Sequence, residues 1–228
     1  VMANNKTIDP LDDRFIIVGQ DDTLDLGGKT LKFYLAPWVH WPDTMFAEVV
    51  EDKVLFTSDF LGTHYASETL FQNDDLPDYL EAAKRYYAAI MMPFRGSVRE
   101  YLELVKTIDP KIIAPSHGPV LQMPAKIVDL YADWASETPK NKVVVAYVSM
   151  HGSTKQMANF LVDALIQRGI PVNQYNLLDT DSGVLGSAIV DAATIILATP
   201  TVLFGPHPVA VNAAYLVRAL RPKTKYLG

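Results

Sequence analysis

The first third of the chain carries apolar residues in short runs that predict strands separated by polar turns. Segments 13–20 and 29–37 each predict a strand, with a turn at residues 26–29 between them. Residues 46–60 predict two further strands joined by an acidic turn, and residues 111–120 predict a buried strand that runs into a Pro/Gly loop. This part of the chain therefore predicts a sheet with ligand-bearing loops at the strand ends.

Between residues 75 and 106 the spacing of apolar residues becomes helical. A first predicted helix ends at Pro93, because proline cannot continue the backbone hydrogen bonding, and a second carries Val98, Leu102 and Val105. A third helix is predicted over 125–136. Four large residues in the first helix are interpreted as core, with a tyrosine reaching a metal pocket as the alternative: Tyr86, Tyr87, Met91 and Met92.

After a predicted linker at residues 136–142, strands and helices alternate. The strands are expected at 142–149, 171–177 and 193–200, and the helices at 154–168, 185–191 and 208–220. Such alternation implies parallel βαβ units. We predict an α/β protein with two domains, 1–137 and 138–228, and a last strand that only begins at the end of the sequence, so that we expect the chain to be incomplete there.

Composition narrows the possible functions. The 228 residues are 49% apolar and 20% charged, which is typical of a globular protein with a sizeable core. A net charge of −6 argues against nucleic-acid binding, and no apolar run approaches the roughly 20 residues that span a membrane. The chain has no cysteine, which excludes disulfides and thiolate metal sites within it. The polar start does not resemble a signal peptide, so we predict a cytoplasmic protein.

A polar loop follows the first strand of the second domain and precedes a helix. Free backbone N–H groups and the positive end of a helix suit a phosphate at such a place. The loop is neither a Walker loop nor a dinucleotide-binding GxGxxG, and it is typical of flavodoxin-like domains that hold FMN. An ordinary helix cap remains the alternative. The predicted phosphate-binding residues are Ser149, Met150, His151, Gly152, Ser153 and Thr154.

A second loop, at residues 198–208, follows a later strand, where a flavin ring would lie. Thr199 and Thr201 offer hydrogen bonds there, and Leu203 and Phe204 offer apolar contact. Two such loops in the expected order favour a flavin site more than either loop alone. The predicted flavin contacts are Pro200, Thr201, Val202, Leu203, Phe204 and Gly205.

Three residues of the first domain follow apolar strands, where ligands on loops are usually carried: His40, Asp59 and His117. Imidazole and carboxylate together suit zinc or iron, and a carboxylate can bridge two ions. A packed or solvent-exposed histidine and a turn aspartate are the ordinary alternatives. His64 and His207 are weaker candidates, interpreted as solvent-exposed and as without a ligand, respectively.

The sequence closely resembles the flavodiiron proteins, also called A-type flavoproteins. The resemblance runs in order through residues ~20–228 and covers both a metallo-β-lactamase-like lobe and a flavodoxin-like lobe, and it extends to the archaeal deazaflavin-dependent oxidases of this family. The segments that carry it are "HWPDTM", "LFTSDFLGTHYAS", "YYAAIMMPF", "IIAPSHGPV", "SMHGSTKQMA" and "ATPTVLFG".

The resemblance implies a non-haem di-iron site, in which His40 ligates one iron, Asp59 bridges the pair and His117 ligates the other. The family draws further iron ligands from an "H-x-E-x-D-H" motif, which this sequence lacks. The family also has a further flavin-contacting loop near the C-terminus, and this sequence lacks that loop as well. We therefore expect a partial αββα lobe followed by a truncated flavodoxin-like sheet. We also expect the sequence to be incomplete at both ends.

The activity implied by the resemblance is reduction of dioxygen to water, or of nitric oxide to nitrous oxide, with electrons passed from FMN to two irons. The implied electron donor is rubredoxin, a reduced deazaflavin coenzyme or a reductase, and the implied assembly is a head-to-tail homodimer or a dimer of dimers. Two alternatives stay open: a zinc-dependent hydrolase of the metallo-β-lactamase type, and an iron-free FMN electron carrier.

Overall fold

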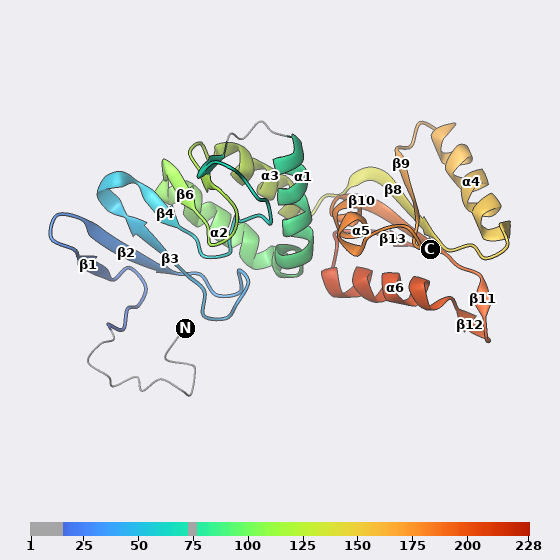
Figure 1. Ribbon diagram of the computed structural model, residues 1–228, viewed down its shortest axis with the longest axis horizontal. Helices are drawn as coiled ribbons and strands as arrows, with labels where there is room; N and C mark the ends of the chain where they lie inside the picture. Colours follow the sequence, from blue (N-terminus) through green and yellow to red (C-terminus); the bar gives the residue numbers. More distant parts are fainter. Residues whose placement is uncertain (1–15, 73–76) are drawn as a thin grey trace. The chain divides into compact units, whose positions relative to one another are not determined.

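The computed structural model describes residues 16–72 and 77–228, and these divide into two compact units (Figure 1). The first unit comprises the described residues up to Tyr86 together with Phe94–Ala132. The second comprises Tyr87–Pro93 and Asp133–Gly228. The predicted domain boundary at residue 137 stays a prediction.

The first unit contains a seven-stranded sheet of order β1-β2-β3-β4-β6-β7-β5. Its strands are β1 (Thr23–Asp25), β2 (Thr30–Leu35), β3 (Met45–Val49), β4 (Val54–Phe56), β5 (Phe71–Gln72), β6 (Ile112–Ala114) and β7 (Val120–Leu121). The pairs β4–β6 and β5–β7 are parallel, and the other neighbours are antiparallel. The described chain thus contributes one sheet to the predicted αββα lobe.

The strand predicted over 13–20 is wrong for its described part. Residues 16–20 form no strand, and residues 13–15 lie outside the described ranges. The reason is a local turn, in which the Asp22 carboxylate accepts a hydrogen bond from the N–H of Gly19 at 2.6 Å. An Asp side chain that bonds the nearby backbone competes with strand pairing, so β1 begins only at Thr23.

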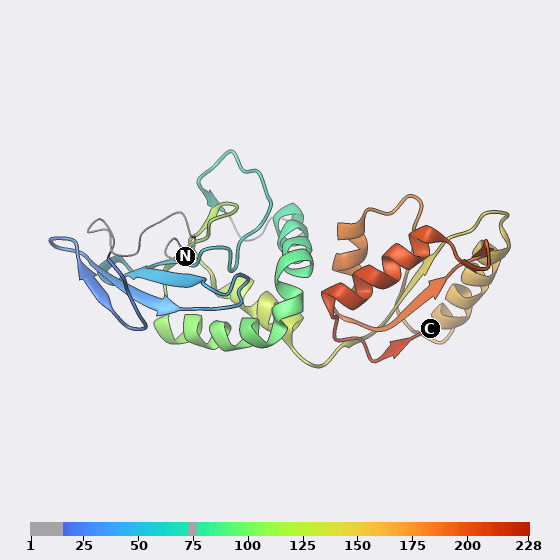
Figure 2. The same ribbon diagram turned by 90° about the horizontal axis from the view of Figure 1, so that it is seen from below.

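Helices cover one face of this sheet. The helices of the first unit are α1 (Pro77–Tyr86), α2 (Arg95–Ile108) and α3 (Ala125–Ala135), and Figure 2 shows α2 along the strands. Phe46 contacts Tyr101 of α2, and Phe60 contacts Tyr131 of α3, each with ring centroids 6.0 Å apart. Side chains alternate between the faces of a strand, and Leu35 and Phe56 on the opposite face are nearly half exposed.

The second unit is a parallel sheet of order β13-β10-β8-β9. Its strands are β8 (Lys140–Tyr147), β9 (Val172–Asn176), β10 (Ala192–Ala198) and β13 (Tyr226–Leu227), and its helices are α4 (Ser153–Ile166), α5 (Ser182–Ile189) and α6 (Pro208–Leu220). The predicted alternation of strands and helices is confirmed. A π-helical turn, η3 (Tyr87–Met91), belongs to this unit, and its Tyr87 packs on Trp134.

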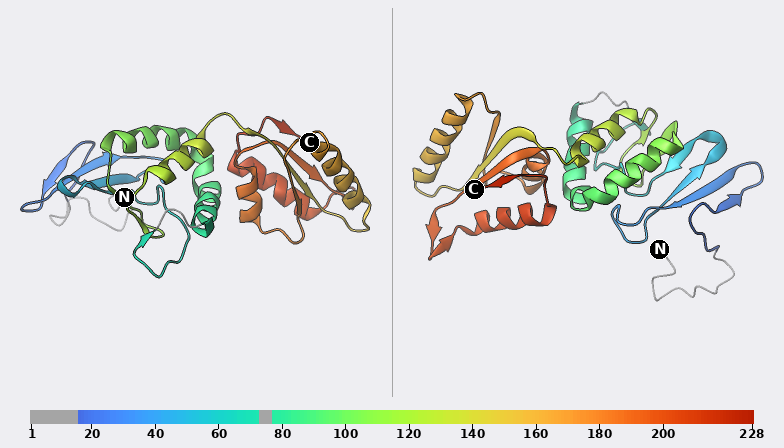
Figure 3. Two further views of the ribbon diagram at one scale, coloured as in Figure 1. Left: turned by 90° about the horizontal axis from the view of Figure 1, so that it is seen from above. Right: turned by 180° about the vertical axis from the view of Figure 1, so that it is seen from behind.

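Both faces of the parallel sheet are covered, as Figure 3 shows. Val143, Val145 and Tyr147 pack with Ala158 of α4 on one face. Val144 and Ala146 point to the other face and are fully buried. Within the described ranges, no helix is both long and apolar enough to cross a membrane.

Candidate metal centre and flavin loops

The strand directions of the first unit bring His40, Asp59 and His117 to one edge of the sheet. Strands β2 and β4 both run antiparallel to β3, and β6 runs parallel to β4. The three strands therefore share one direction, and the loops that follow them leave from the same edge. Each of these loops carries one of the predicted ligands.

Asp59 lies between the two histidines. Its Oδ2 is 3.2 Å from Nε2 of His40, and its Oδ1 is 3.3 Å from Nε2 of His117. The carboxylate side chain is only 17% exposed, whereas the His117 ring is half exposed. One carboxylate thus presents a separate oxygen to each imidazole.

This geometry fits part of a two-metal centre. No three His, Asp or Glu side chains within residues 16–72 and 77–228 gather around a single point that would hold one ion. Instead, each histidine meets its own oxygen of Asp59, as expected when a carboxylate bridges two ions. With two ions bound, the three side chains would offer one imidazole and one carboxylate oxygen to each, so a complete centre would need further ligands.

Hydrogen bonds between two loops fix the backbone around Asp59 and His117. Ser116 N–H donates to the Ser58 carbonyl at 2.7 Å, and Thr63 N–H donates to the His117 carbonyl at 3.1 Å. Gly118 adopts a φ of +84°, and a Cβ there would lie 2.6 Å from the Thr63 carbonyl oxygen. Only glycine fits this close approach without a shift of the backbone.

Aromatic rings surround His40 on its exposed side. The His40 ring lies 5.5 Å from Trp41 and 6.5 Å from Phe94, and Trp38 stacks on Phe94 at 6.3 Å. Both tryptophans remain more than half exposed. Trp41 and Phe94 therefore pack beside His40, and Trp38 packs on Phe94.

Tyr86 is a residue of this site that periodicity alone assigns to the helix core. It is buried, and its hydroxyl donates to the main-chain carbonyl of Asp59 at 2.9 Å. Burial raises the pKa of Tyr86, and the charge of Asp59 raises it further. His64 is exposed as predicted, yet its ring lies 4.8 Å from Tyr86 and 5.6 Å from His117.

The two predicted flavin loops of the second unit meet at one pocket of about 210 Å³. Seven of the twelve predicted flavin contacts line it: Met150, His151, Ser153, Thr154, Pro200, Thr201 and Val202. Gly152 has a φ of +88° before the first turn of α4, and its N–H donates to the Ser149 hydroxyl at 3.1 Å. The structure thus brings both loops together at a helix N-terminus.

Leu203 and Phe204 form the tip of a hairpin that the sequence does not predict. Strands β11 (Thr201–Val202) and β12 (Gly205–Pro206) flank them, and both residues have positive φ, 48° and 70°. Two positive φ angles are typical of a type I′ hairpin turn. Both side chains are almost fully exposed.

His207 caps a helix. Its Nδ1 accepts a hydrogen bond from the Val209 N–H at 3.2 Å at the start of α6, and its own N–H donates to the Thr199 hydroxyl at 3.0 Å. Thr199 therefore holds the base of the hairpin through His207.

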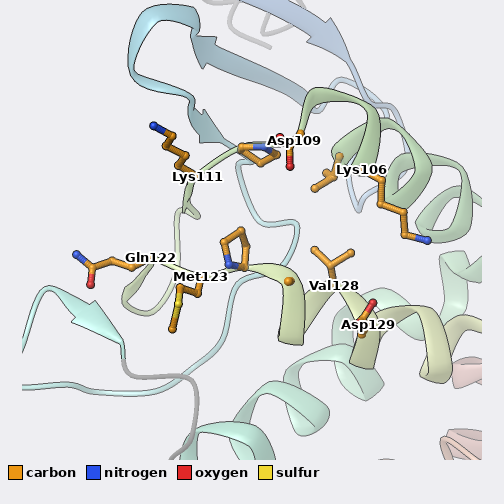
Figure 4. A pocket seen from close by; sticks show the side chains of 11 residues that line it. Lys106, Asp109, Lys111, Gln122, Met123, Val128 and Asp129 are labelled. Atoms are coloured by element: carbon orange, nitrogen blue, oxygen red, sulfur yellow. The ribbon is translucent and has the colours of Figure 1, made fainter.

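A larger pocket, of about 600 Å³, lies in the first unit between the end of α2 and the start of α3 (Figure 4). It contains none of the predicted site residues. Val128 is among the residues that line it, and the polar ends of Lys111 and Gln122 point away from that valine in Figure 4. Volume alone therefore does not identify the functional site in this molecule.

Residues 7–118 match the family model described as "ODP family beta lactamase". The chain is 34% identical over 213 residues to the coenzyme F420H(2) oxidase of Methanothermobacter marburgensis, covering 91% of this chain and 52% of that protein. It is 35% identical over 219 residues to the nitric oxide reductase of Moorella thermoacetica, covering 94% and 55%.

Solved structures match as well. The rubredoxin oxygen:oxidoreductase of Desulfovibrio gigas matches with a TM-score of 0.91 and 29% identity over 100% of this chain and 58% of that chain. The flavodiiron protein of Giardia intestinalis matches with a TM-score of 0.85 and 30% identity over 90% and 51%. The predicted fold class is confirmed. The chain spans about half the length of the relatives it matches.

Proposed function

We propose that this chain, which belongs to the flavodiiron protein family, is part of an oxidoreductase that reduces dioxygen to water or nitric oxide to nitrous oxide. The observation that carries the proposal is Asp59, with a separate oxygen on each of two histidine Nε2 atoms. The names of its relatives support the same two reactions: an F420H(2) oxidase, a nitric oxide reductase and a rubredoxin oxygen:oxidoreductase.

In this proposal His40, Asp59 and His117 hold two non-haem iron ions, with Asp59 shared between them. A pair of irons, when bound, supplies electrons to the gas and stabilises the charge that develops on it. Asp59 keeps the two imidazoles on opposite sides of one carboxylate. The rings of Trp41 and Phe94 lie beside His40 in this proposed site.

Tyr86 is the chain's own proton-bearing group beside the centre. A tyrosine phenol is protonated at neutral pH, and burial together with the charge of Asp59 raises the pKa of Tyr86 further. The hydroxyl hydrogen is engaged by the Asp59 carbonyl, so the phenol orients the Asp59 backbone and leaves both carboxylate oxygens to the imidazoles.

We further propose that FMN binds the pocket between the two loops of the second unit. The free N–H groups at the start of α4 and the hydroxyls of Ser149, Ser153 and Thr154 would hold its phosphate. The second loop, through Pro200 to Gly205, would lie along the ring. FMN supplies the electrons that reach the metal centre.

The remaining partners are proposals as well. We infer a reduced deazaflavin coenzyme, rubredoxin or a reductase as electron donor, in keeping with the relatives named F420H(2) oxidase and rubredoxin oxygen:oxidoreductase. We also propose a head-to-tail homodimer, or a dimer of two such dimers, that joins the flavin of one copy to the metal of the other. A cytoplasmic location suits a chain without cysteine.

The test is to purify the protein from its native host, measure its iron, zinc and FMN content, and follow the consumption of dioxygen and nitric oxide with a reduced donor. Iron and FMN together, with turnover of either gas, would support the proposal. Zinc without flavin would replace it with a hydrolase, and FMN without iron would replace it with an electron carrier.

A further inference from the structure

A third pocket in the first unit, of about 440 Å³, lies between α2 and the strands β2 and β3. Lys32, Tyr34 and Glu48 line it from the sheet, and Leu104 and Thr107 line it from the helix. Its lining includes none of the residues assigned to the metal centre or to the flavin loops. Whatever it binds would therefore be separate from both proposed cofactors.

Glu48 is a buried carboxylate that faces this pocket. The residue is 8% exposed, and its Oε2 accepts a hydrogen bond from the Tyr34 hydroxyl at 2.7 Å. A carboxylate has two oxygens and about four acceptor sites, so one hydroxyl satisfies only a part of it. A charge buried in this way costs much free energy unless an opposite charge accompanies it.

The nearest lysine does not provide that charge. Lys32 lies directly opposite Glu48 in the β2–β3 register, where opposite charges normally pair. Its ammonium instead lies 2.9 Å from Oδ1 of Asp21 and 5.0 Å from the centre of the Tyr34 ring. Among the described residues, Glu48 has no ion pair.

Hydrogen bonds hold Asp21 in the position where it pairs with Lys32. Its other oxygen, Oδ2, accepts a hydrogen bond from the Gln20 side-chain amide at 3.2 Å, and the amide oxygen of Gln20 accepts from the Leu35 N–H at 2.8 Å. This arrangement ties Asp21 to strand β2, where its carboxylate pairs with Lys32. Within the described ranges, the carboxylate of Glu48 on the pocket wall is therefore not compensated by an ion pair.

We propose that this pocket binds a small organic cation, a primary ammonium or guanidinium on a short aliphatic chain, with Glu48 as its counter-ion. Thr107 donates its own hydroxyl hydrogen to the Glu103 carbonyl at 2.9 Å, which leaves the hydroxyl oxygen free to accept from the ligand. Leu104 and Ile108 provide apolar surface for the aliphatic chain. A divalent metal ion suits the pocket poorly, because it needs about six oxygen ligands.

The first test is calorimetric titration of the full chain with n-butylammonium at low salt, beside n-butanol and butyrate as probes of equal length. The expected result is saturable binding of the ammonium alone. Glu48→Gln keeps an acceptor for Tyr34 but removes the charge, and should weaken binding at least about tenfold. Glu100→Gln makes the same change on the exposed face of α2 and should leave binding unchanged.

A second set of variants tests the role of Asp21 and does not depend on Glu48→Gln being folded. Asp21→Asn should release Lys32 to pair with Glu48 and so weaken binding of the probe. The double variant Asp21→Asn/Lys32→Met should restore it, which a merely damaged pocket would not do.

Three results would overturn the proposal. These are no saturable binding of n-butylammonium to the unaltered chain, equal binding of n-butanol, or unchanged binding in Glu48→Gln. A failure of the double variant to recover would equally remove the role given to Glu48 as counter-ion.

Discussion

Two carboxylates of the first unit, Asp59 and Glu48, are both shielded from solvent but have different surroundings. Both are largely buried, and each is paired with a buried tyrosine. Tyr86 bonds the main-chain carbonyl of Asp59 and leaves both carboxylate oxygens to the two histidines. Tyr34 bonds the carboxylate of Glu48 itself, and no cationic side chain of the described residues pairs with it.

The difference shows that the atom to which a tyrosine donates helps decide what a buried carboxylate can bind. At Asp59 the phenol fixes the backbone, so the side chain can serve two imidazoles or two metal ions. At Glu48 the phenol occupies one oxygen and leaves the other facing a cavity, a geometry suited to a single cation. Removing each part of the two sites tests this distinction.

The largest effect is expected from Asp59→Asn, measured as iron content of the full-length protein from its native host. The substitution keeps the side-chain volume but removes the charge and one carboxylate oxygen. Losing a hydrogen-bond partner of a metal ligand already weakens metal binding about 10–100-fold, so the loss of Asp59, the proposed bridging ligand, should reduce bound iron at least as much.

Asp129→Asn provides the matched control for Asp59→Asn. Asp129 is exposed on α3, away from the sheet edge that carries the histidines, and its substitution should leave iron content unchanged. Full retention of iron in Asp59→Asn would show that Asp59 is not a ligand and would contradict the proposal that its carboxylate bridges two ions.

The next largest effect is expected on stability, from Gly118→Ala. The new Cβ would approach the Thr63 carbonyl oxygen to 2.6 Å at a positive φ, so strain and overlap together should lower the free energy of unfolding by about 2–5 kcal/mol. Gly27→Ala is the control, because Gly27 also has a positive φ, of 77°, but open space around it. It should cost only about 1–2 kcal/mol. Equal losses in urea unfolding would mean that the loop around His117 is not tightly packed.

Tyr34→Phe should lower the free energy of unfolding by about 1.5–3 kcal/mol, because it leaves an oxygen of the buried Glu48 without its donor. Urea denaturation at neutral pH measures the loss. Iron content should not change, since Tyr34 lies outside the Asp59 site. A loss of iron in this variant would show that the two carboxylates are coupled.

The same variant should alter the response to alkaline pH. Burial, the hydrogen bond to Glu48 and the charge of that carboxylate all raise the pKa of Tyr34. The unfolded chain therefore releases this proton first, near pH 10, and the stability of the folded state falls as the pH rises further. Tyr86, Tyr101 and Tyr175 act in the same direction, so Tyr34→Phe should make the decline shallower without abolishing it. An unchanged slope in urea titrations from pH 9 to about 11 would contradict this assignment.

The contrast between the carboxylates also explains what the sequence could predict. Asp59 and the two histidines each follow an apolar strand. Because strands of the same direction end at one edge of a sheet, the three side chains are expected to lie near one another there. The alternation of strands and helices in the second unit likewise predicts a parallel sheet, because each element is long and periodic. The strand at 16–20 was lost to a single side-chain bond from Asp22, which no periodicity reveals.

The sequence gives no sign of the pocket at Glu48 and offers Tyr86 near the metal pocket only as an alternative, because each residue depends on a partner distant in sequence. Glu48 stands in a predicted strand just before the acidic turn at Glu51–Asp52, and only the β2–β3 register places it opposite Lys32. Tyr86 follows the helical period of its neighbours, and its bond to Asp59 spans 27 residues. The Leu203–Phe204 turn is hidden for another reason: type I′ turns favour Asn and Gly, and these residues give no such signal.

The smallest effect on the free energy of unfolding is expected from Tyr86→Phe. This variant tests the contrast between the two tyrosine–carboxylate pairs most directly. The Asp59 carbonyl that loses the phenol still accepts a hydrogen bond from the Gly62 N–H at 3.2 Å, so the cost should be about 0.5–1.5 kcal/mol. Tyr101→Phe removes a hydroxyl with no hydrogen bond within the described part of the chain and gives the baseline. If Tyr86→Phe cost more than Tyr34→Phe, the hydroxyl on a carbonyl would matter more than the hydroxyl on a carboxylate. The choice of acceptor by each tyrosine would then no longer explain why the two acidic side chains differ.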